Sequence, residues 1–295
     1  MSFRDTLKGT GVALVTPFRS DKSVDYDGLL RLINFVIEGG VQYVVTLGTT
    51  GETPTLTKEE KIDIIEATYT LVAGRVPVVV GIGGNDTRSV IKEIESFPLE
   101  KAAAILSVSP YYSKPSQEGI YQHYKALASA TAKSIILYNV PGRTGSNIAA
   151  HTTVRLANDI SNINGIKEAS GNMLQCMQIL RDKPQEFMVV SGDDALALPQ
   201  IACGMDGVIS VAANCFPKDL SMMVNAIMSG DLIAARALNN KLLEGYDLMF
   251  IENNPAGVKA FLTEMGIIEN HLRLPLVPLS HGVHKQVQNY IPTLK

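Results

Sequence analysis

GVISVAAN, residues 207–214, is the last of a series of apolar, β-prone runs in this chain, and it decides between two parallel folds. Seven similar runs precede it, separated by segments with helical periodicity. This alternation indicates parallel strands joined by crossover helices. With 207–214 as the eighth strand, eight βα units within residues 1–215 favour a closed (β/α)8 TIM barrel over an open doubly wound sheet.

The remaining strands and the first helices are predicted from the same pattern. Upstream of 207–214, the expected strands are 11–17, 43–49, 77–83, 103–110, 134–140, 163–170 and 187–193. Three helices begin with recognisable N-caps, namely Asp25 before 27–38, Thr57 with Glu60 as a capping box, and Ser116 before 117–129.

After Asn214 the strand pattern stops. The rest of the chain predicts helices only, at about 217–228, 231–249, 255–265 and 281–290. We therefore expect a catalytic barrel over residues 1–215, followed by a C-terminal helical appendage over residues 216–295.

Composition excludes several classes of function. The 295 residues carry a net charge of −3 without a Lys/Arg cluster, which argues against nucleic-acid or membrane-surface binding and favours small-molecule chemistry. The three cysteines, Cys176, Cys203 and Cys215, form no CxxC pair, and they suggest a reducing compartment. The N-terminus lacks a signal-like apolar core and no run of 18 apolar residues occurs, so we expect a cytoplasmic protein.

GIKEAS, residues 165–170, places a lysine in a run that is otherwise typical of a buried strand. Period-2 alternation puts Lys167 on one face with Gly165 and Ala169, so small residues flank its ammonium group. Burial disfavours the charged form of a lysine, as an amine requires before it attacks a carbonyl to form a Schiff base. A lysine that snorkels to water explains the stretch equally well.

Other chemically useful residues follow the ends of the predicted strands, where the active site of a barrel lies. They are Thr49 and Thr50 in GTTGE, Tyr111 and Tyr112 in SPYYSKPS, Tyr138 and Arg143 in YNVPGRTG, and the SGDD stretch. GTTGE either holds a carboxylate or phosphate or simply forms a tight turn. The tyrosine pair suits packing as well as catalysis, and the arginine is either a solvated surface charge or a carboxylate-binding group.

No metal or nucleotide site is predicted. GIGGND, residues 81–86, has neither a GxGxxG nor a Walker spacing. His281 and His284 have a metal-like spacing, but no acidic or cysteine partner accompanies them in the sequence. Asp193 and Asp194 open a predicted helix, where carboxylates favour the helix dipole as readily as a cation.

Two stretches at the expected separation carry a family resemblance over almost the whole chain. GVQYVVTLGTTGE (40–52), and YNVPGRTG (138–145) followed by GIKEAS, resemble the pyruvate-dependent class I lyase family that includes dihydrodipicolinate synthase and N-acetylneuraminate lyase. GTTGE, Arg143 in its context and PYYSKPSQEGIYQHY (110–124) look like the dihydrodipicolinate synthase branch.

The resemblance implies a catalytic role for four residues. Lys167 would form an imine with pyruvate and so yield an enamine nucleophile. Tyr138 would relay protons with Thr49 and Tyr112, and in this family the last of these tyrosines reaches the site of the neighbouring subunit. A homodimer or homotetramer is therefore expected.

The resemblance also implies substrate contacts and a reaction. Thr50 would hold the pyruvate carboxylate, and Gly192 and Ile209 would line the pocket with backbone groups. Arg143 would bind the carboxylate of L-aspartate 4-semialdehyde. The product would be 4-hydroxy-tetrahydrodipicolinate, a precursor of lysine and diaminopimelate, made without a cofactor. The alternatives are a pyruvate-dependent lyase acting on a sialic acid or 2-keto-3-deoxy sugar acid, or a non-enzymatic keto-acid-binding barrel.

One departure from the family concerns regulation. Lysine-inhibited members carry a histidine and a glutamate at two positions of an effector cleft, where this chain has Lys61 and Ser89. Asn85 and Tyr111 match the family pattern. A cationic Lys61 without the carboxylate should not hold the ammonium of the effector, so we expect weak or absent feedback inhibition.

Overall fold

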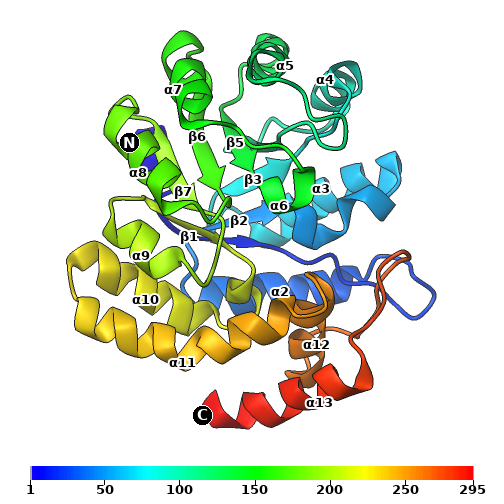
Figure 1. Ribbon diagram of the computed structural model, residues 1–295. Helices are drawn as coiled ribbons and strands as arrows, with labels where there is room; N and C mark the ends of the chain where they lie inside the picture. Colours follow the sequence, from blue (N-terminus) through cyan, green and yellow to red (C-terminus); the bar gives the residue numbers. More distant parts are fainter. Residues whose placement is uncertain (1, 295) are drawn as a thin grey trace.

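The computed structural model describes residues 2–294, and its centre is a closed barrel of eight parallel strands (Figure 1). The strands pair in sequence order, and β1 pairs with β8 in parallel to close the ring. They are β1 Gly9–Ala13, β2 Tyr43–Thr46, β3 Val78–Gly81, β4 Ala104–Val108, β5 Ile135–Asn139, β6 Ile163–Glu168, β7 Met188–Ser191 and β8 Gly207–Ser210. The predicted (β/α)8 barrel is confirmed.

Helices surround this barrel and continue beyond it. They are α1 Phe3–Thr6, α2 Tyr26–Glu38, α3 Lys58–Val72, α4 Thr87–Ser96, α5 Gln117–Ser129, α6 Pro141–Thr144, α7 Ala150–Asp159, α8 Met173–Asp182, α9 Ala197–Ala202, α10 Pro217–Ser229, α11 Leu232–Phe250, α12 Ala256–Glu264 and α13 His281–Tyr290. None of the helices within residues 2–294 combines the length and apolarity needed to cross a membrane.

The strands begin within two residues of their predicted starts, but each ends one to four residues early. The β2 run shows the reason. The strand stops at Thr46 because Leu47 adopts a left-handed conformation with φ of 55°. The chain then forms a 3-10 turn over Thr49–Gly51 instead of continuing the ladder. The residues lost from the strands form the loops at the mouth of the barrel.

All three predicted residues occupy the N-cap position of their helix, and two of them also form the side-chain hydrogen bond. Thr57 and Glu60 form the expected capping box, and the Ser116 hydroxyl accepts a hydrogen bond from the backbone N–H of Gly119 at 3.2 Å. Asp25 is the N-cap residue of α2, as predicted, but its side chain makes no cap hydrogen bond. Its carboxylate lies instead between the guanidinium groups of Arg19 and Arg31, at 3.8 and 3.5 Å, where opposite charges attract it.

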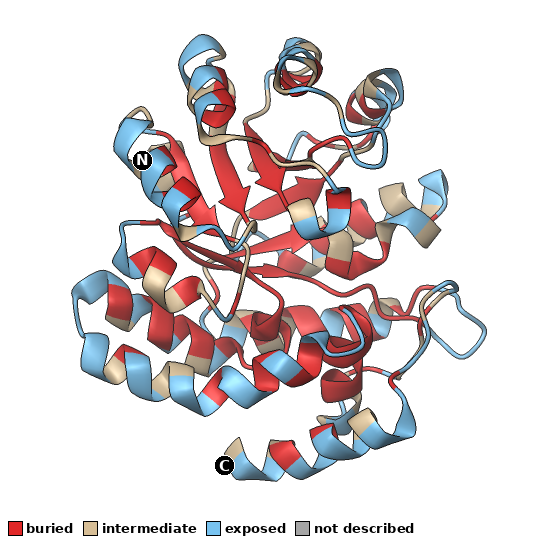
Figure 2. Cartoon of the chain, in the orientation of Figure 1, coloured by how far each residue is buried: buried red, intermediate tan, exposed pale blue. Residues whose placement is uncertain are grey.

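Two apolar layers hold the barrel together. Figure 2 shows that the strands and the inner faces of the surrounding helices are buried. The outer layer lies between strands and helices. The inner cluster fills the barrel and comprises Leu7, Ala13, Tyr43, Val45, Val79, Ala104, Leu106, Ile136, Tyr138, Val140, Met188, Val190 and Ile209. Successive side chains along each strand point alternately into the barrel and toward the helices, so they belong alternately to the inner and the outer layer.

The four C-terminal helices lie on one flank of the barrel (Figure 1). α10 contacts α9, α2 and β1, so it covers the seam where the barrel closes. α11 runs back along α10, and α12 and α13 pack against α11. Phe216, Phe261 and Tyr290 join these helices in an edge-to-face aromatic cluster, with ring centroids 5.5 to 6.4 Å apart.

We predict that His123 makes the fold sensitive to mild acid. Its ring is buried in α5, with Nδ1 2.9 Å from the Thr87 hydroxyl, and burial lowers its pKa from 6.5 to about 4. Between these values the unfolded chain binds the proton more readily, so the free energy of unfolding falls as the pH drops from 6.5 toward 4. The loss at pH 5 should be about 2 kcal/mol.

Urea unfolding of the native protein and of a His123→Gln variant, each at pH 7.5 and pH 5, measures this effect. The variant should lose less stability on acidification than the native protein does. Equal losses in both proteins would show that other groups control the acid sensitivity.

Candidate active site

A cavity of about 830 Å³ opens at the C-terminal ends of the strands. The barrel residues that line it include six site residues predicted from the sequence, namely Thr49, Thr50, Tyr138, Arg143, Lys167 and Gly192. The C-terminal helices supply the opposite wall with Tyr246, Asp247, Phe250, Ile251, Asn253 and Asn254. The cavity therefore lies between the barrel and its helical extension.

Lys167 and Tyr138 lie side by side inside the barrel. They are register partners across β6 and β5, and Lys167 Nζ is 4.4 Å from the centroid of the Tyr138 ring. Lys167 is only 4% exposed, so its side chain does not snorkel to bulk water. A buried amine beside a phenol at the edge of a cavity can act as a nucleophile with a proton-transfer partner.

Gly192, after β7, makes room for this lysine. A Cβ atom at Gly192 would lie 2.9 Å from Cε of Lys167 and 2.6 Å from Cβ of Ala169. Any larger residue would therefore displace the amine. Ile209, predicted to line the pocket, is not among the residues that line this cavity; it is fully buried in the inner cluster that also contains Tyr138.

A buried carboxylate fixes the strands behind the lysine. Glu168 points to the other face of β6, and Asn139 donates to both of its oxygens at 2.9 and 3.2 Å. The Gln175 amide and the Ser170 backbone N–H donate at 3.0 and 2.7 Å. Because Asn139 follows Tyr138 and Glu168 follows Lys167, these hydrogen bonds hold the side chains of Tyr138 and Lys167 in register.

The GTTGE loop is fixed from several directions. The Thr53 hydroxyl donates to the carbonyl of Leu47 at 2.8 Å, and the Thr16 hydroxyl donates to the carbonyl of Gly51 at 2.7 Å. Thr50 is 2% exposed, whereas Thr49 is partly exposed and lines the cavity. The turn is therefore rigid and presents two threonines of different accessibility.

The contribution of the C-terminal helices to the site was not predicted from the sequence. The Asn254 amide donates to the Thr50 hydroxyl oxygen at 3.0 Å, and the Arg143 guanidinium donates to the Asn254 carbonyl at 3.3 Å. Asn254 follows α11 in the stretch ENNPAG, and this helix break was the only available signal. Arg143 is exposed, as predicted, but it lies on the short helix α6 and lines the cavity.

A buried ion pair joins the same two parts of the chain. Lys259 Nζ lies 2.5 Å from Oε1 of Glu52, and both side chains are fully buried. Lys259 also donates to the carbonyl of His271, and Glu52 accepts the backbone N–H of Arg273. Desolvation lowers the pKa of Lys259 to about 8, against the opposing attraction of Glu52.

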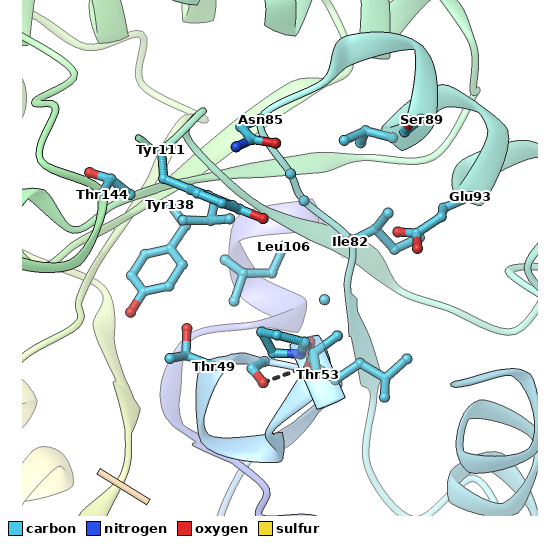
Figure 3. A pocket seen from close by; sticks show the side chains of 18 of the residues that line it. Thr49, Thr53, Ile82, Asn85, Ser89, Glu93, Leu106, Tyr111, Tyr138 and Thr144 are labelled. Atoms are coloured by element: carbon cyan, nitrogen blue, oxygen red, sulfur yellow. Dashed lines mark hydrogen bonds between the residues drawn. The ribbon is translucent and has the colours of Figure 1, made fainter. Parts of the chain in front are cut away.

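The four effector-site candidates meet in a second cavity of about 490 Å³, and Figure 3 shows three of them, Asn85, Ser89 and Tyr111. Lys61, Asn85, Ser89 and Tyr111 all line it. Sequence reasoning missed Glu93, which lies one helical turn beyond Ser89 and forms a 2.8 Å salt bridge with Lys61. Thr49, Tyr138 and Arg143 line this cavity too, and Figure 3 shows the Tyr138 hydroxyl pointing toward Thr49.

Tyr112 does not join the other proposed relay residues within this chain. It is 88% exposed, and it has a left-handed backbone with φ of 71°. Its backbone N–H donates to the carbonyl of Thr144 at 3.3 Å, which fixes the loop next to Arg143. The side chain thus projects away from the chain that carries it.

The other polar candidates have partners within the fold. Asp193 accepts the backbone N–H groups of Ala195 and Leu196, and Asp194 accepts those of Val211 and Ala212. His284 contacts Glu264 at 2.8 Å, an acidic neighbour that the sequence did not reveal. Across residues 2–294, no group of three His, Cys, Asp or Glu side chains is arranged to hold a metal ion.

Comparisons with known proteins agree with this geometry. The model of the dihydrodipicolinate synthetase family matches residues 6–294. The 4-hydroxy-tetrahydrodipicolinate synthase of Parabacteroides distasonis is 51% identical over 288 residues, which cover 98% of this chain and 97% of that protein.

Two solved structures are also similar. One is a chloride-inhibited dihydrodipicolinate synthase from Acinetobacter baumannii complexed with pyruvate, with 41% identity, a TM-score of 0.95, and coverage of 98% of this chain and 99% of that chain. The other, from Cyanidioschyzon merolae with lysine bound, has 33% identity, a TM-score of 0.95, and coverage of 100% and 99%. The chain therefore belongs to the dihydrodipicolinate synthetase family.

Proposed function

We propose that this protein is a lyase that condenses pyruvate with L-aspartate 4-semialdehyde to give 4-hydroxy-tetrahydrodipicolinate, in the pathway to lysine and diaminopimelate. The observation that carries this proposal is the buried Lys167 beside Tyr138, at a cavity that Arg143 also lines. The names of the relatives, and the pyruvate in the Acinetobacter structure, support the choice of reaction and first substrate.

Lys167 performs the covalent chemistry. Its neutral amine attacks C2 of pyruvate and expels the keto oxygen as water, which leaves a protonated imine. Loss of a proton from the methyl carbon gives an enamine, whose carbon adds to the aldehyde carbon of the semialdehyde. The amino group of the condensed substrate then attacks the imine carbon, and cyclisation releases the lysine.

Each proton movement requires a nearby acid or base. The ring of Tyr138 lies beside the amine, and we assign Tyr138 the relay role together with Thr49. Tyr112 of the partner subunit completes this relay, because the exposed Tyr112 side chain of one chain is free to enter a neighbouring site. The functional unit is therefore at least a homodimer, and we propose a homotetramer.

The remaining site residues bind the two carboxylates. Thr50 holds the carboxylate of pyruvate, and Gly192 and Ile209 contribute backbone groups. Thr50 and Gly192 line the cavity, whereas Ile209 lies in the inner cluster. Arg143 binds the carboxylate of the semialdehyde in a planar, two-point manner. A cavity of about 830 Å³ has room for both substrates at once.

The domain assignment and location follow from the same proposal. Residues 1–215 supply the catalytic barrel, and residues 216–295 form the helical region that walls the cavity. A biosynthetic role and three cysteines without a disulfide among the described residues support a cytoplasmic location.

Borohydride trapping tests the covalent step. Reduction in the presence of pyruvate should add one reduced pyruvyl group to Lys167, as read by peptide mass spectrometry. Lys167→Ala should lose the adduct and lower kcat by roughly 10³-fold or more, because no other group forms the imine. The exposed Lys101→Ala serves as a matched control. An adduct elsewhere, or an unaffected Lys167→Ala enzyme, contradicts the mechanism.

Subunit mixing tests the position of Tyr112. Lys167→Ala and Tyr112→Phe proteins should each be nearly inactive, whereas unfolding and reassembling them together should restore about one quarter of native activity. Recovery occurs because a mixed dimer contains one site with an intact lysine and an intact partner tyrosine. No recovery, with dimers present by sedimentation, would place Tyr112 in its own subunit's site.

We further propose that L-lysine inhibits this enzyme weakly or not at all. The relative from Cyanidioschyzon merolae was solved with lysine bound, but here Lys61 occupies the effector cleft and already neutralises Glu93. Activity should persist at roughly 10 mM lysine and neutral pH, because the ammonium of the ligand meets a cation. A Lys61→His, Ser89→Glu double variant should become more sensitive. Half-inhibition of the native enzyme at millimolar lysine or below contradicts this view.

A further inference from the structure

We propose that Asn254, from the junction between α11 and α12, is a positioning residue for pyruvate that acts by orienting the hydroxyl of Thr50. This inference rests on the proposed function, because it assigns to Thr50 the carboxylate of pyruvate. It extends that function by making the C-terminal helical region part of substrate recognition.

The contact between the two residues is short, buried and long-range. The Asn254 amide nitrogen lies 3.0 Å from the Thr50 hydroxyl oxygen, and the residues are 204 positions apart in the sequence. The two side chains are 4% and 2% exposed, and both residues line the cavity that contains Lys167. Water therefore does not compete for this hydrogen bond as it does at a surface.

The direction of the hydrogen bond determines what Thr50 can offer. An amide NH₂ donates, so it occupies a lone pair of the threonine oxygen and leaves the single O–H proton free. That proton can then be donated to an anionic oxygen in the cavity, and a hydrogen bond to a charged group is stronger than one to a neutral group. Asn254 thus sets Thr50 as a donor toward a carboxylate.

The other polar atoms of Asn254 support a specific role. Its backbone carbonyl accepts the guanidinium of Arg143 at 3.3 Å, so one residue contacts both groups assigned to bind substrate carboxylates. Its side-chain Oδ1 is buried and has no hydrogen-bond partner among residues 2–294. A buried unpaired acceptor costs free energy, which an apolar residue of similar size would avoid if the amide nitrogen had no task.

Two substitutions at this position change the hydrogen bond to Thr50 in different ways. Asn254→Ala removes the donor, lets the Thr50 hydroxyl rotate, and should raise KM for pyruvate about tenfold with a smaller change in kcat. Asn254→Asp replaces the donor by an acceptor, which draws the Thr50 proton away from pyruvate and adds a negative charge. Its KM for pyruvate should therefore rise further than that of Asn254→Ala, by about tenfold more.

A double-mutant cycle shows whether Asn254 acts through Thr50. Thr50→Val should raise KM for pyruvate, and adding Asn254→Ala to it should cause little further change, because the hydroxyl to be oriented is already absent. The exposed Asn240→Ala variant on α11 is the matched control and should behave as native. Thermal unfolding of each variant reports any loss of fold separately.

Three results would overturn the inference. They are an additive double variant, an Asn254→Asp enzyme with a KM for pyruvate no higher than that of Asn254→Ala, or an effect of Asn254→Ala on thermal unfolding without a change in KM. Borohydride trapping at saturating pyruvate distinguishes this failure from failure of the proposed function. If Lys167 is still trapped in these variants, the imine mechanism stands and only the role of Asn254 is lost.

Discussion

The parallel register between β5 and β6 is the constraint on which the site depends. It places Tyr138 opposite Lys167 on the inner face and Asn139 opposite Glu168 on the outer face. A slip of one residue would exchange these faces, burying a carboxylate inside the barrel and moving the amine into the helix layer. The hydrogen bonds from Asn139 to Glu168 oppose that slip, because they form only when both strands are correctly aligned. The outer network thus maintains the inner, reactive pair.

The second constraint ties the GTTGE loop to the C-terminal helices. Burying an ion pair costs desolvation energy, and it is tolerated only where further hydrogen bonds satisfy both ions. Glu52 and Lys259 meet this condition through the backbone of Arg273 and the carbonyl of His271. Lys259 also lies 4.2 Å from the ring centroid of Phe18, and the Arg273 guanidinium lies 4.5 Å from it. This network fixes the threonines against the wall that contains Asn254.

Local patterns predicted the fold well, and they failed where distant residues meet. Strand starts and the Thr57 capping box depend on neighbouring residues, so the sequence contains them directly. The burial of Lys167 depends on barrel closure, which its own strand cannot reveal. Asn254 is 204 residues from Thr50, and Glu93 reaches the cavity of about 490 Å³ because it lies one helical turn beyond Ser89 and pairs with Lys61. Asp25 occupies the predicted N-cap position, but its carboxylate pairs with nearby arginines instead of capping the helix.

The two cavities share part of their lining, but the charged residues in their walls are paired differently. Thr49, Tyr138 and Arg143 line both cavities, so a ligand in the cavity of about 490 Å³ can contact residues that also line the cavity of Lys167. Such a ligand can change catalysis only if the shared wall has two arrangements and the ligand binds one of them more tightly than the other. The Lys61–Glu93 salt bridge lies in the wall of the cavity of about 490 Å³, so an ionic ligand must compete with one partner of this pair to contact the other. The inner cavity carries no such internal pair against Arg143 among the described residues, so its cation remains available to a substrate carboxylate.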